Sequence, residues 1–372
     1  FSPGHQAAIP KDEPGEFRIV YVGETIERLL CSIINNCLFD LLPEMVHKSC
    51  KSYQKGIGCG KVVKEASARL MKIDGDVVGG KYDFHHFFDT VNRESIMALF
   101  DKVEARLGFD KGAEPVINLL RRTWNSDLLF DLDGNLVEHY SGIRQGNACG
   151  SWLADAILYE LDEFMSNKYE YYVRYSDDLI VIHDDVDEVT ADINSIIKKY
   201  GVSLNPKKIE TLRKDRWFKF LGFSIRGDKI SLSSGKLKTF QKEIQRRSVK
   251  AYKDSPQKIL HSVNNYLYKG DKDGHSWATN VLPVINSEHD INELNKFVLD
   301  CLRAGVTKKG KTGGLGYVPT QEDGVISRGT GKNVKANRQK VPGKISGFMT
   351  LNCARNALLS SHDAYDALVR MI

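Results

Sequence analysis

The sequence predicts an α+β protein with a small antiparallel sheet and a helical C-terminal part. Two strand-like runs stand out, one around residues 76–84 and one over residues 171–185. The second consists of two short arms joined by a polar turn, which is a hairpin signature. Apolar residues recur at helical spacing before, between and after these runs, and from Lys236 onward the pattern is helical and basic. Strands that pair with each other, with helices set apart, are typical of the α+β class.

The N-terminal region, up to about residue 70, predicts two helices. The segment ETIERLLCSIINNCLFDLLP has apolar residues at helical spacing and is closed by Pro43. The segment CKSYQKGIGCGKVVKEASARLM then runs from a glycine-rich bend into a second helix. The periodic residues of the first helix are Ile26, Leu29, Leu30, Ile33 and Ile34.

The central region holds both strand runs and the helices between them. Amphipathic patterns predict helices near 93–107, 113–124 and 150–166, and DLDGN at 131–135 predicts a hairpin turn. After the second strand run come a helix in DEVTADINSIIKKYG and a short strand, KFLGFSI. The acidic run at 184–188 begins this helix, where carboxylates complement the helix dipole.

The C-terminal region predicts a basic helix, a long loop and a final helix. Over 236–253, apolar residues gather near one face, and only Glu243 opposes the lysines and arginines on the remainder. Residues 305–347 are glycine-rich without apolar periodicity, which predicts a long loop or a segment ordered by a partner. The last segment, FMTLNCARNALLSSHDAYDALVRMI, is periodic enough to form a helix.

Composition excludes several classes of protein. With 372 residues, of which 41% are hydrophobic, the chain can bury a sizeable core in two or three lobes. It has no run of about 18 uncharged apolar residues, so we expect no membrane-spanning helix and no membrane partner. The seven cysteines include no CxxC pair, which favours free thiols in a reducing cytoplasm over a disulfide framework.

The net charge of +5 is unevenly distributed. Between Cys301 and Lys344, ten Lys or Arg residues are opposed only by Glu322 and Asp323. This concentration indicates a polyanionic partner, with a solvated basic loop as the alternative.

Acidic residues stand at the ends of both strand runs. Asp83 ends the first, and Asp177 and Asp178 form the tip of the hairpin. Clustered carboxylates repel one another and resist ionisation unless a cation is present. Two Mg²⁺ ions about 4 Å apart, held by such carboxylates, can activate a 3′-hydroxyl and neutralise a leaving pyrophosphate. Two adjacent aspartates alone more often mark a solvated turn, which is the alternative interpretation.

Five motifs in the same order make the sequence resemble the reverse transcriptases over roughly residues 8–225. YDFHHFFDTV resembles motif A with its D-x-x-x-F-F-D spacing, GIRQGNACGSW resembles motif B, and YSDD stands where that family has Y-x-D-D. LNPKK resembles the Lys-bearing motif D, and FLGF resembles the primer grip. Each motif alone could match by chance, but five in order leave little room for it. The resemblance implies a right-hand polymerase of fingers, palm and thumb, with an antiparallel palm sheet and a helical thumb.

The resemblance implies that a cluster of residues binds metal and performs the chemistry. Asp83 and Asp177 would be the principal ligands of two Mg²⁺ ions, for which Mn²⁺ is a substitute. Asp178 would be the third carboxylate, and the carbonyl of Phe84 a further ligand. Lys208 matches the motif D lysine, a candidate general acid for the pyrophosphate.

The resemblance also implies a deoxynucleotide site. Phe88 falls where the family has a steric gate against the ribose 2′-hydroxyl, and its alternative is an ordinary core residue, as expected for Phe87. The Gln-Gly pair would lie against the incoming nucleotide and the template base, and two N-terminal cations would clamp the triphosphate. The residues implied for dNTP binding are Lys11, Arg18, Phe88, Gln145 and Gly146.

Further residues are implied to hold nucleic acid. The primer grip comprises Phe220, Leu221 and Gly222, and the basic helix that follows fits a thumb that binds phosphates without reading bases. The basic candidates are Lys238, Lys242, Arg246, Lys250, Lys308, Lys309 and Lys311. The implied domains are fingers at 1–75, a palm at 76–232 with a fingers insertion at about 93–140, and a helical thumb and C-terminal RNA-binding region at 233–372, with a basic glycine-rich segment at 301–347.

Two departures from the family pattern concern motif B. Arg144 replaces the proline that commonly precedes Gln-Gly, and Gly150, Ser151 and Trp152 stand where many members have Ser-Pro. These changes leave the catalytic assignment intact and loosen any statement about how the template base is held.

We therefore expect an RNA-directed DNA polymerase, a nucleotidyltransferase that extends a DNA primer with dNTPs on an RNA template. One alternative is an RNA-dependent RNA polymerase, but the motif A spacing, Phe88 and the serine of YSDD favour DNA synthesis. The other alternative is a retroelement-derived RNA-binding or splicing maturase, in which polymerisation is secondary.

The kind of reverse transcriptase is a hypothesis by elimination. The sequence shows no recognisable ribonuclease H, integrase or endonuclease domain, and no Val-Thr-Gly element like that of retron enzymes. Gln145 departs from the aliphatic residue of diversity-generating enzymes. These absences favour a stand-alone bacterial retroelement-type enzyme, group II intron-like or defence-associated, which uses a structured noncoding RNA and acts in antiviral defence against phage.

Overall fold

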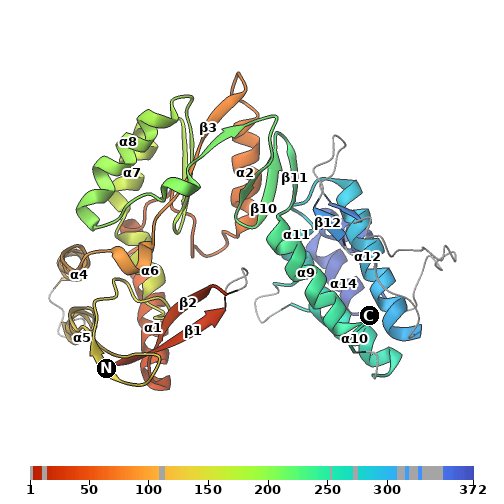
Figure 1. The fold of residues 1–372 in the computed structure, drawn as a ribbon, viewed down its shortest axis with the longest axis horizontal. Coiled ribbons are helices and arrows are strands. Elements are labelled where there is room, and N and C mark those ends of the chain that lie inside the picture. The colour runs from red at the N-terminus through yellow and green to blue at the C-terminus, as the bar shows by residue number, and fades with distance from the viewer. Residues whose placement is uncertain are drawn as a thin grey trace. The chain divides into compact units, whose positions relative to one another are not determined.

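The computed structural model describes residues 3–10, 15–108, 114–251, 254–270, 275–307, 315–317, 326–328 and 347–372. The chain divides into two compact units, of which the first comprises residues 1–57 and 74–212 and the second residues 58–73 and 213–372 (Figure 1). These units do not follow the domain boundaries expected from the sequence, because residues 58–73, expected in the fingers, belong to the second unit. Which residues form the fingers, palm and thumb stays a prediction.

The first unit contains a four-stranded sheet in the order β6-β7-β3-β8, of which Figure 1 labels β3. Strand β7 is antiparallel to both of its neighbours, β6 and β3. Tyrosine, valine, isoleucine and leucine dominate these three strands, and such residues suit a pleated, largely buried surface. The strands are β3 (Val77–Asp83), β6 (Tyr171–Tyr175), β7 (Asp178–Ile182) and β8 (Glu210–Arg213). The predicted antiparallel sheet and its hairpin are confirmed.

Helices and 3₁₀ turns of the first unit contribute to its core, which includes the fully buried Phe100 and Trp124. Two helices begin at capping residues: Asn92 accepts from the backbone N–H of Ser95, and Asp185 accepts from that of Glu188. The elements are α1 (Thr25–Leu41), η1 (Pro43–Met45), α3 (Phe87–Thr90), α4 (Arg93–Leu107), α5 (Glu114–Asn125), α6 (Gly150–Ala156), α7 (Tyr159–Lys168), α8 (Val186–Ile197), η2 (Lys198–Tyr200) and η3 (Pro206–Lys208).

The long helix predicted near 150–166 is in fact two helices, α6 and α7. The buried side chain of Arg174 donates to the backbone carbonyls of Ala154 and Asp155, at 3.2 and 2.8 Å. These carbonyls belong to the last turn of α6, and a basic side chain that binds such groups stabilises a helix end.

The first predicted helix, α1, is present, but most of its periodic apolar residues are exposed to solvent. The helix packs on the core through Cys31 and Leu38 instead. The exposed fractions are 73% for Ile26, 62% for Leu29, 41% for Leu30 and 51% for Ile33. Helical periodicity thus predicted the helix without showing which of its faces is buried.

A second sheet of the first unit has the order β2-β1-β4-β5. Strand β1 pairs antiparallel with β2 and parallel with β4. The predicted DLDGN turn joins β4 to β5, and the Asp131 carboxylate accepts the backbone N–H groups of Asp133 and Asn135. The strands are β1 (Gly4–Pro10), β2 (Phe17–Val22), β4 (Leu128–Phe130) and β5 (Leu136–Glu138).

The second unit contains a three-stranded antiparallel sheet in the order β11-β10-β9, against which α2 (Cys59–Leu70) packs. The hydroxyl of Ser67 on α2 donates to the carbonyl of Gly227 at 3.0 Å. The single strand predicted in KFLGFSI is two strands, because Leu221 and Gly222 both have positive φ and reverse the chain. The strands are β9 (Phe218–Phe220), β10 (Phe223–Arg226) and β11 (Lys229–Leu232).

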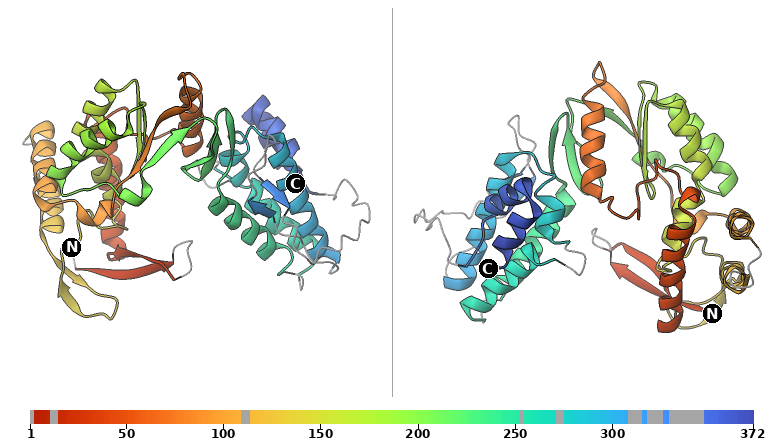
Figure 2. Two further views of the ribbon diagram at one scale, coloured as in Figure 1. Left: turned by 45° about the horizontal axis from the view of Figure 1, so that its top comes forward. Right: turned by 180° about the vertical axis from the view of Figure 1, so that it is seen from behind.

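The remaining helices of the second unit pack against one another (Figure 2). The predicted basic helix ends at Arg247, before 253, and the predicted final helix is two helices, the second capped by Ser361. Within 305–347, residues 305–307 end a helix, and residues 315–317 and 326–328 form two short paired strands. The elements are α9 (Ser234–Arg247), α10 (Pro256–Tyr268), α11 (Trp277–Val281), α12 (Glu288–Thr307), β12 (Leu315–Tyr317), β13 (Ile326–Arg328), α13 (Leu351–Ser360) and α14 (His362–Val369).

Two expectations from composition can be compared with this fold. None of the helices in the described ranges is long and apolar enough to cross a membrane. The seven cysteines are free thiols, as predicted.

Candidate active site

The register of β3 against β7 brings the predicted carboxylates to one edge of the sheet. Asp83, the last residue of β3, pairs with Asp178, the first residue of β7. Asp177 lies in the turn just before β7, and its carbonyl accepts the backbone N–H of Phe84 at 3.3 Å. Three carboxylates from sequence positions nearly a hundred residues apart thus lie together, as the motifs predicted.

Burial and the neighbouring negative charge make Asp177 and Asp178 harder to ionise. Burial raises the pKa of Asp177, and the neighbouring charge of Asp83 raises it further. Burial also raises the pKa of Asp178 to about 6, against the opposing effect of Lys81. The site therefore lacks positive charge when all three carboxylates are ionised.

Lys208 supplies one positive charge. Its Nζ lies 2.9 Å from each oxygen of Asp83. The backbone N–H of Asn205 donates to the Asp83 carbonyl at 2.8 Å, which places the short η3 turn beside the end of β3. Burial alone would lower the pKa of Lys208, but its bond to Asp83 and the nearby carboxylates raise it.

The donor set fits a divalent cation, although the side chains are not arranged around one. Within the described ranges, no three Asp, Glu, His or Cys side chains are placed to hold a metal ion as they stand. Both oxygens of Asp83 accept from Lys208 instead. Carboxylates are the ligands that Mg²⁺ prefers, and the raised pKa values of Asp177 and Asp178 show that more positive charge would be favourable. The role of the Phe84 carbonyl stays a prediction.

The two phenylalanines of the motif A segment differ in burial. Phe87 is 2% exposed and belongs to the core, whereas Phe88 is partly buried. The Phe88 carbonyl accepts the backbone N–H of Ile143 at 2.7 Å, and a Cβ on Gly142 would lie only 2.1 Å from that carbonyl oxygen. Phe88, the residue predicted as the gate, therefore adjoins the Gln145–Gly146 loop.

The Gln145–Gly146 loop lies against β2, the strand that carries Arg18. The backbone N–H of Tyr21 donates to the Gln145 carbonyl at 2.7 Å. Gly146 has a φ of 97°, and a Cβ there would lie 2.9 Å from the Tyr21 carbonyl oxygen. The Gln145 Oε1 atom is buried without a hydrogen-bond partner in the described structure, which leaves an acceptor free for a ligand.

Of the two cations predicted to clamp the triphosphate, Arg18 lies within the described residues and Lys11 does not. Arg18 is exposed on β2, and its charge lowers the pKa of Asp177.

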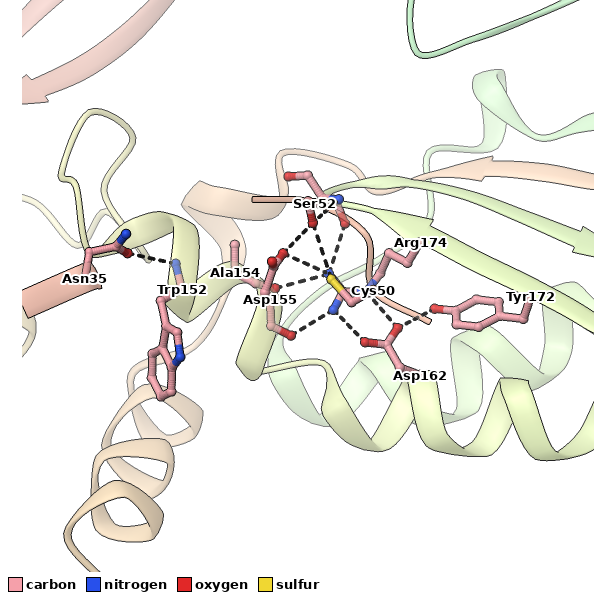
Figure 3. A network of polar contacts seen from close by, with 10 residues as sticks. Asn35, Cys50, Ser52, Trp152, Ala154, Asp155, Asp162, Tyr172 and Arg174 are labelled. Atoms are coloured by element: carbon pink, nitrogen blue, oxygen red, sulfur yellow. Dashed lines mark hydrogen bonds and ion pairs between the residues drawn. The ribbon is translucent and has the colours of Figure 1, made fainter. Parts of the chain in front are cut away.

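Sequence reasoning missed a group of residues that lies behind the carboxylates. Ser52, Asp155 and Arg174 are fully buried and form a polar network with Asp162 (Figure 3). Tyr53 is hydrogen-bonded to Ser176, next to the predicted ligand Asp177. The one available signal was an arginine in the otherwise apolar strand YYVRY.

In the second unit, the predicted primer grip forms the β9–β10 hairpin. The Gly222 carbonyl accepts the backbone N–H of Ser233, and the Lys236 ammonium lies 4.0 Å from the centre of the Phe223 ring. This unit also holds the predicted phosphate-binding residues. Lys238, Lys242, Arg246 and Lys250 are exposed, whereas Lys308, Lys309 and Lys311 lie outside the described residues.

Comparison of the sequence with family models gives one match. The model described as "Reverse transcriptase (RNA-dependent DNA polymerase)" matches residues 9–225, which is more than half of the chain. No curated protein matches the sequence.

Among solved structures, the chain is similar to telomerase chains. Apo telomerase from Candida tropicalis has 14% identity and a TM-score of 0.49, over 83% of this chain and 57% of that chain. Telomerase from Candida albicans, in complex with the TWJ fragment of telomeric RNA, has 13% identity and a TM-score of 0.43, over 82% of this chain and 61% of that chain. The present chain thus spans about three fifths of the length of these telomerase chains.

Proposed function

Because the chain belongs to the reverse transcriptase family, we propose that it is an RNA-directed DNA polymerase that extends a DNA primer with dNTPs on an RNA template. The predicted fold class, a right-hand polymerase with an antiparallel palm sheet, is confirmed. The observation that carries the proposal is the convergence of Asp83, Asp177, Asp178 and Lys208 at one end of the β3–β7 pair.

The carboxylates have the role of holding divalent metal. Asp83, Asp177 and Asp178 would hold two Mg²⁺ ions, or Mn²⁺ in their place, with the Phe84 carbonyl as a further ligand. Bound metal of this kind activates the primer 3′-hydroxyl and offsets the charge of the pyrophosphate. Lys208, whose ammonium lies beside these carboxylates, would donate a proton to the leaving pyrophosphate.

The loops beside the carboxylates select and hold the nucleotide. Phe88 excludes a ribose 2′-hydroxyl, and the free acceptor of Gln145, with the close-packed Gly146, lies against the nucleotide and the template base. Arg18, with Lys11, clamps the triphosphate through charge-assisted hydrogen bonds.

The second unit holds the nucleic acid. Phe220, Leu221 and Gly222 support the primer, and the exposed lysines and arginine of α9 and the residues after it bind phosphates without reading sequence. Lys308, Lys309 and Lys311, which lie outside the described residues, are proposed to bind RNA phosphates as well.

A primer-extension assay tests the polymerase proposal. The purified protein, given a DNA primer on an RNA template with dNTPs and Mg²⁺, should extend the primer, and Asp177→Ala and Asp178→Ala should each abolish extension. A matched control is Asp184→Ala, which removes an exposed carboxylate beyond the end of β7. Extension by ribonucleotides alone would favour an RNA polymerase instead, and biological activity that survives both aspartate changes would favour a maturase.

We also propose a biological role, in which the enzyme copies one dedicated RNA template. We propose that the enzyme is a bacterial reverse transcriptase that copies a structured noncoding RNA in defence against phage. Sequencing of the RNA that copurifies with the protein, and of the cDNA made from it, should give one enriched RNA species. Random host RNA with no enriched species would contradict a dedicated template.

A further inference from the structure

The turn that carries Asp177 contains a residue in an unfavourable backbone conformation. Ser176 has a φ of 57°, a region that costs free energy for a residue other than glycine. The turn joins β6 to β7 between the paired residues Tyr175 and Asp178. A positive φ at the first central residue is a feature of the type II′ hairpin turn, which favours glycine there. Ser176 keeps this conformation only if its surroundings hold it.

Two side chains bind the two polar backbone groups of Ser176. Its N–H donates to the Ser52 hydroxyl at 2.9 Å, and its carbonyl accepts from Arg174 Nη1 at 3.2 Å. The chain around Ser52 is attached to β6 as well. The N–H of Lys51 donates to the Arg174 carbonyl at 2.8 Å, and the Arg174 N–H donates to the Ser49 carbonyl at 3.0 Å.

Arg174 is fixed because all five of its guanidinium N–H groups have acceptors (Figure 3). Nε and Nη2 donate to the two carboxylate oxygens of Asp162, at 2.7 and 2.6 Å. Nη2 also donates to the Asp155 carbonyl, and Nη1 donates to the carbonyls of Ala154 and Ser176. The side chain is fully buried, so the ion pair with Asp162 is not screened by water. A lysine, with three donors and no planar fork, could not satisfy these acceptors.

Ser52 is fixed by the same network. Its hydroxyl proton goes to the Asp155 carboxylate, at 2.5 Å, so that the oxygen lone pairs face the Ser176 N–H. We call Ser52, Asp155, Asp162 and Arg174 the Ser176 clamp. Ser52 lies in the segment before α2, Asp155 in α6, Asp162 in α7 and Arg174 in β6.

The clamp also reaches the nucleotide-binding loop. Ala154 and Asp155 belong to the last turn of α6, and α6 begins four residues after Gly146. A single guanidinium therefore bonds to the end of α6 and to the turn that carries Asp177. A displacement of one would be resisted by the other.

We propose that Arg174 and Ser52 are positioning residues that hold Ser176 in its left-handed conformation and thereby fix the direction of the Asp177 carboxylate. The clamp also couples this direction to α6 and to the loop that binds the nucleotide. This inference rests on the proposed polymerase function. A role in folding alone would lower the stability of the protein without changing turnover by the molecules that do fold.

The test compares Ser52→Ala with Ser52→Ala combined with Ser176→Gly. Turnover is measured per active site, counted from the first-turnover burst, over a range of Mg²⁺ concentrations. Ser52→Ala leaves the Arg174–Asp162 pair intact and should lower kcat about tenfold, because one hydrogen bond that orients the turn is lost. It should also raise the Mg²⁺ concentration for half-maximal rate severalfold. Glycine adopts a positive φ without strain. In the Ser176→Gly protein, the effect of Ser52→Ala on kcat should therefore shrink to about threefold or less.

Ser231→Ala is the matched control for stability. Ser231 is also fully buried and also donates its hydroxyl proton to a buried aspartate, Asp290, on the second unit. It should lower the melting temperature about as much as Ser52→Ala does, with no change in the Mg²⁺ response.

The outcomes separate the inference from the proposed function. A wild-type protein without primer extension would remove the polymerase proposal itself. An active wild type whose Ser52→Ala variant keeps its turnover per active site and its Mg²⁺ response would overturn the clamp, as would an equal loss with and without Ser176→Gly. If Ser52→Ala does not fold, recovery of a folded, active protein by Ser176→Gly supports the clamp, and failure to recover overturns it.

Discussion

The ammonium of Lys208 lies 2.9 Å from both carboxylate oxygens of Asp83, although 125 positions separate the two residues in the chain. The same two oxygens are the ones that a metal ion would need. If Asp83 holds metal as proposed, lysine and metal would compete for these two oxygens.

This competition predicts that Lys208→Ala lowers both the maximal rate and the Mg²⁺ concentration needed to reach half of that rate. Without the ammonium, Asp83 is free for metal, so the rate should reach half its maximum at a lower Mg²⁺ concentration than in the wild type. The maximal rate should fall about 100-fold, because the general acid for the pyrophosphate is lost. Primer extension over a Mg²⁺ titration measures both quantities. Lys207→Ala, which removes the exposed neighbouring lysine, is the control and should change neither. A rate loss with an unchanged Mg²⁺ dependence would remove the competition.

The buried Asp155 predicts how stability depends on pH. Burial raises its pKa to about 6, against the opposing effect of Arg174. A carboxyl whose pKa is higher in the folded state contributes stability that is present below the unfolded value near pH 4 and is lost as the pH rises through about 6. The loss amounts to about 3 kcal/mol at most. Asparagine has no charge to bury and can still accept from Ser52.

Denaturant unfolding of the wild type and Asp155→Asn, from pH 4 to pH 8, measures this dependence. The difference in unfolding free energy should move in favour of the variant between pH 4 and pH 7 and stay constant above that. Parallel curves for the two proteins would show that Asp155 is ionised throughout. Asp215→Asn, at an exposed carboxylate, controls for a general effect of the lost charge.

Local patterns in the sequence predicted the hairpin and its aspartates, because a strand–turn–strand signal lies within fifteen residues. The contacts that hold this turn were not predictable in the same way. Ser52 lies 124 positions from Ser176, and nothing near Ser52 in the sequence marks it as a hydrogen-bond partner of a distant turn. The break between α6 and α7 was missed for the same reason, because the carbonyls at the end of α6 bond to Arg174 on a later strand.

Sequence patterns also did not show which faces of the helices are buried. The apolar residues of α1 predicted a helix correctly, yet Ile26 and Leu29 are mostly exposed. Periodicity reports where apolar residues lie around a helix, whereas burial depends on which other elements pack there. Phe87 is a core residue, as expected, whereas Phe88 is partly buried and packs against the core, and its role as a gate stays a prediction.

Phe88 should control the choice of sugar. Phe88→Ala removes the ring from the position assigned to the gate, so ribonucleotides should be incorporated about 100-fold more readily relative to deoxynucleotides, which corresponds to the loss of one steric clash worth about 3 kcal/mol. Single-nucleotide extension with dNTP and rNTP measures this ratio. Phe87→Ala is the paired variant: it should destabilise the core by about 3–5 kcal/mol and leave the ratio unchanged. An unchanged ratio in Phe88→Ala would make Phe88 an ordinary core residue.

Gly146 should be needed for the close approach of the Gln145–Gly146 loop to β2. A Cβ there would lie 2.9 Å from the Tyr21 carbonyl oxygen, and the φ of 97° is itself unfavourable for alanine. Gly146→Ala should therefore raise the KM for dNTPs about tenfold or more, since a displacement of the loop misplaces the nucleotide. Gly134→Ala is a matched control, because Gly134 also has a positive φ but no atom within 4 Å of its Cβ position. An equal KM change in Gly146→Ala and Gly134→Ala would indicate that backbone strain, and not the close approach of residue 146 to the Tyr21 carbonyl, causes the effect.

The exposed lysines of α9 should bind phosphates. Lys238 and Lys242 lie one turn apart on the helix, opposite its buried Leu237 and Ile244, whereas Arg246 is engaged with Glu243 at 2.8 Å. Each phosphate contact contributes close to one unit to the slope of log affinity against log salt concentration, so Lys238→Gln with Lys242→Gln should reduce this slope by about 2. Fluorescence anisotropy with a primer–template duplex between low and moderate salt measures it. Lys102→Gln with Lys198→Gln removes the same charge from exposed positions of the first unit and should leave the slope unchanged. Equal slopes for the two double variants would place the phosphate contacts on another surface, because a general loss of positive charge acts on both alike.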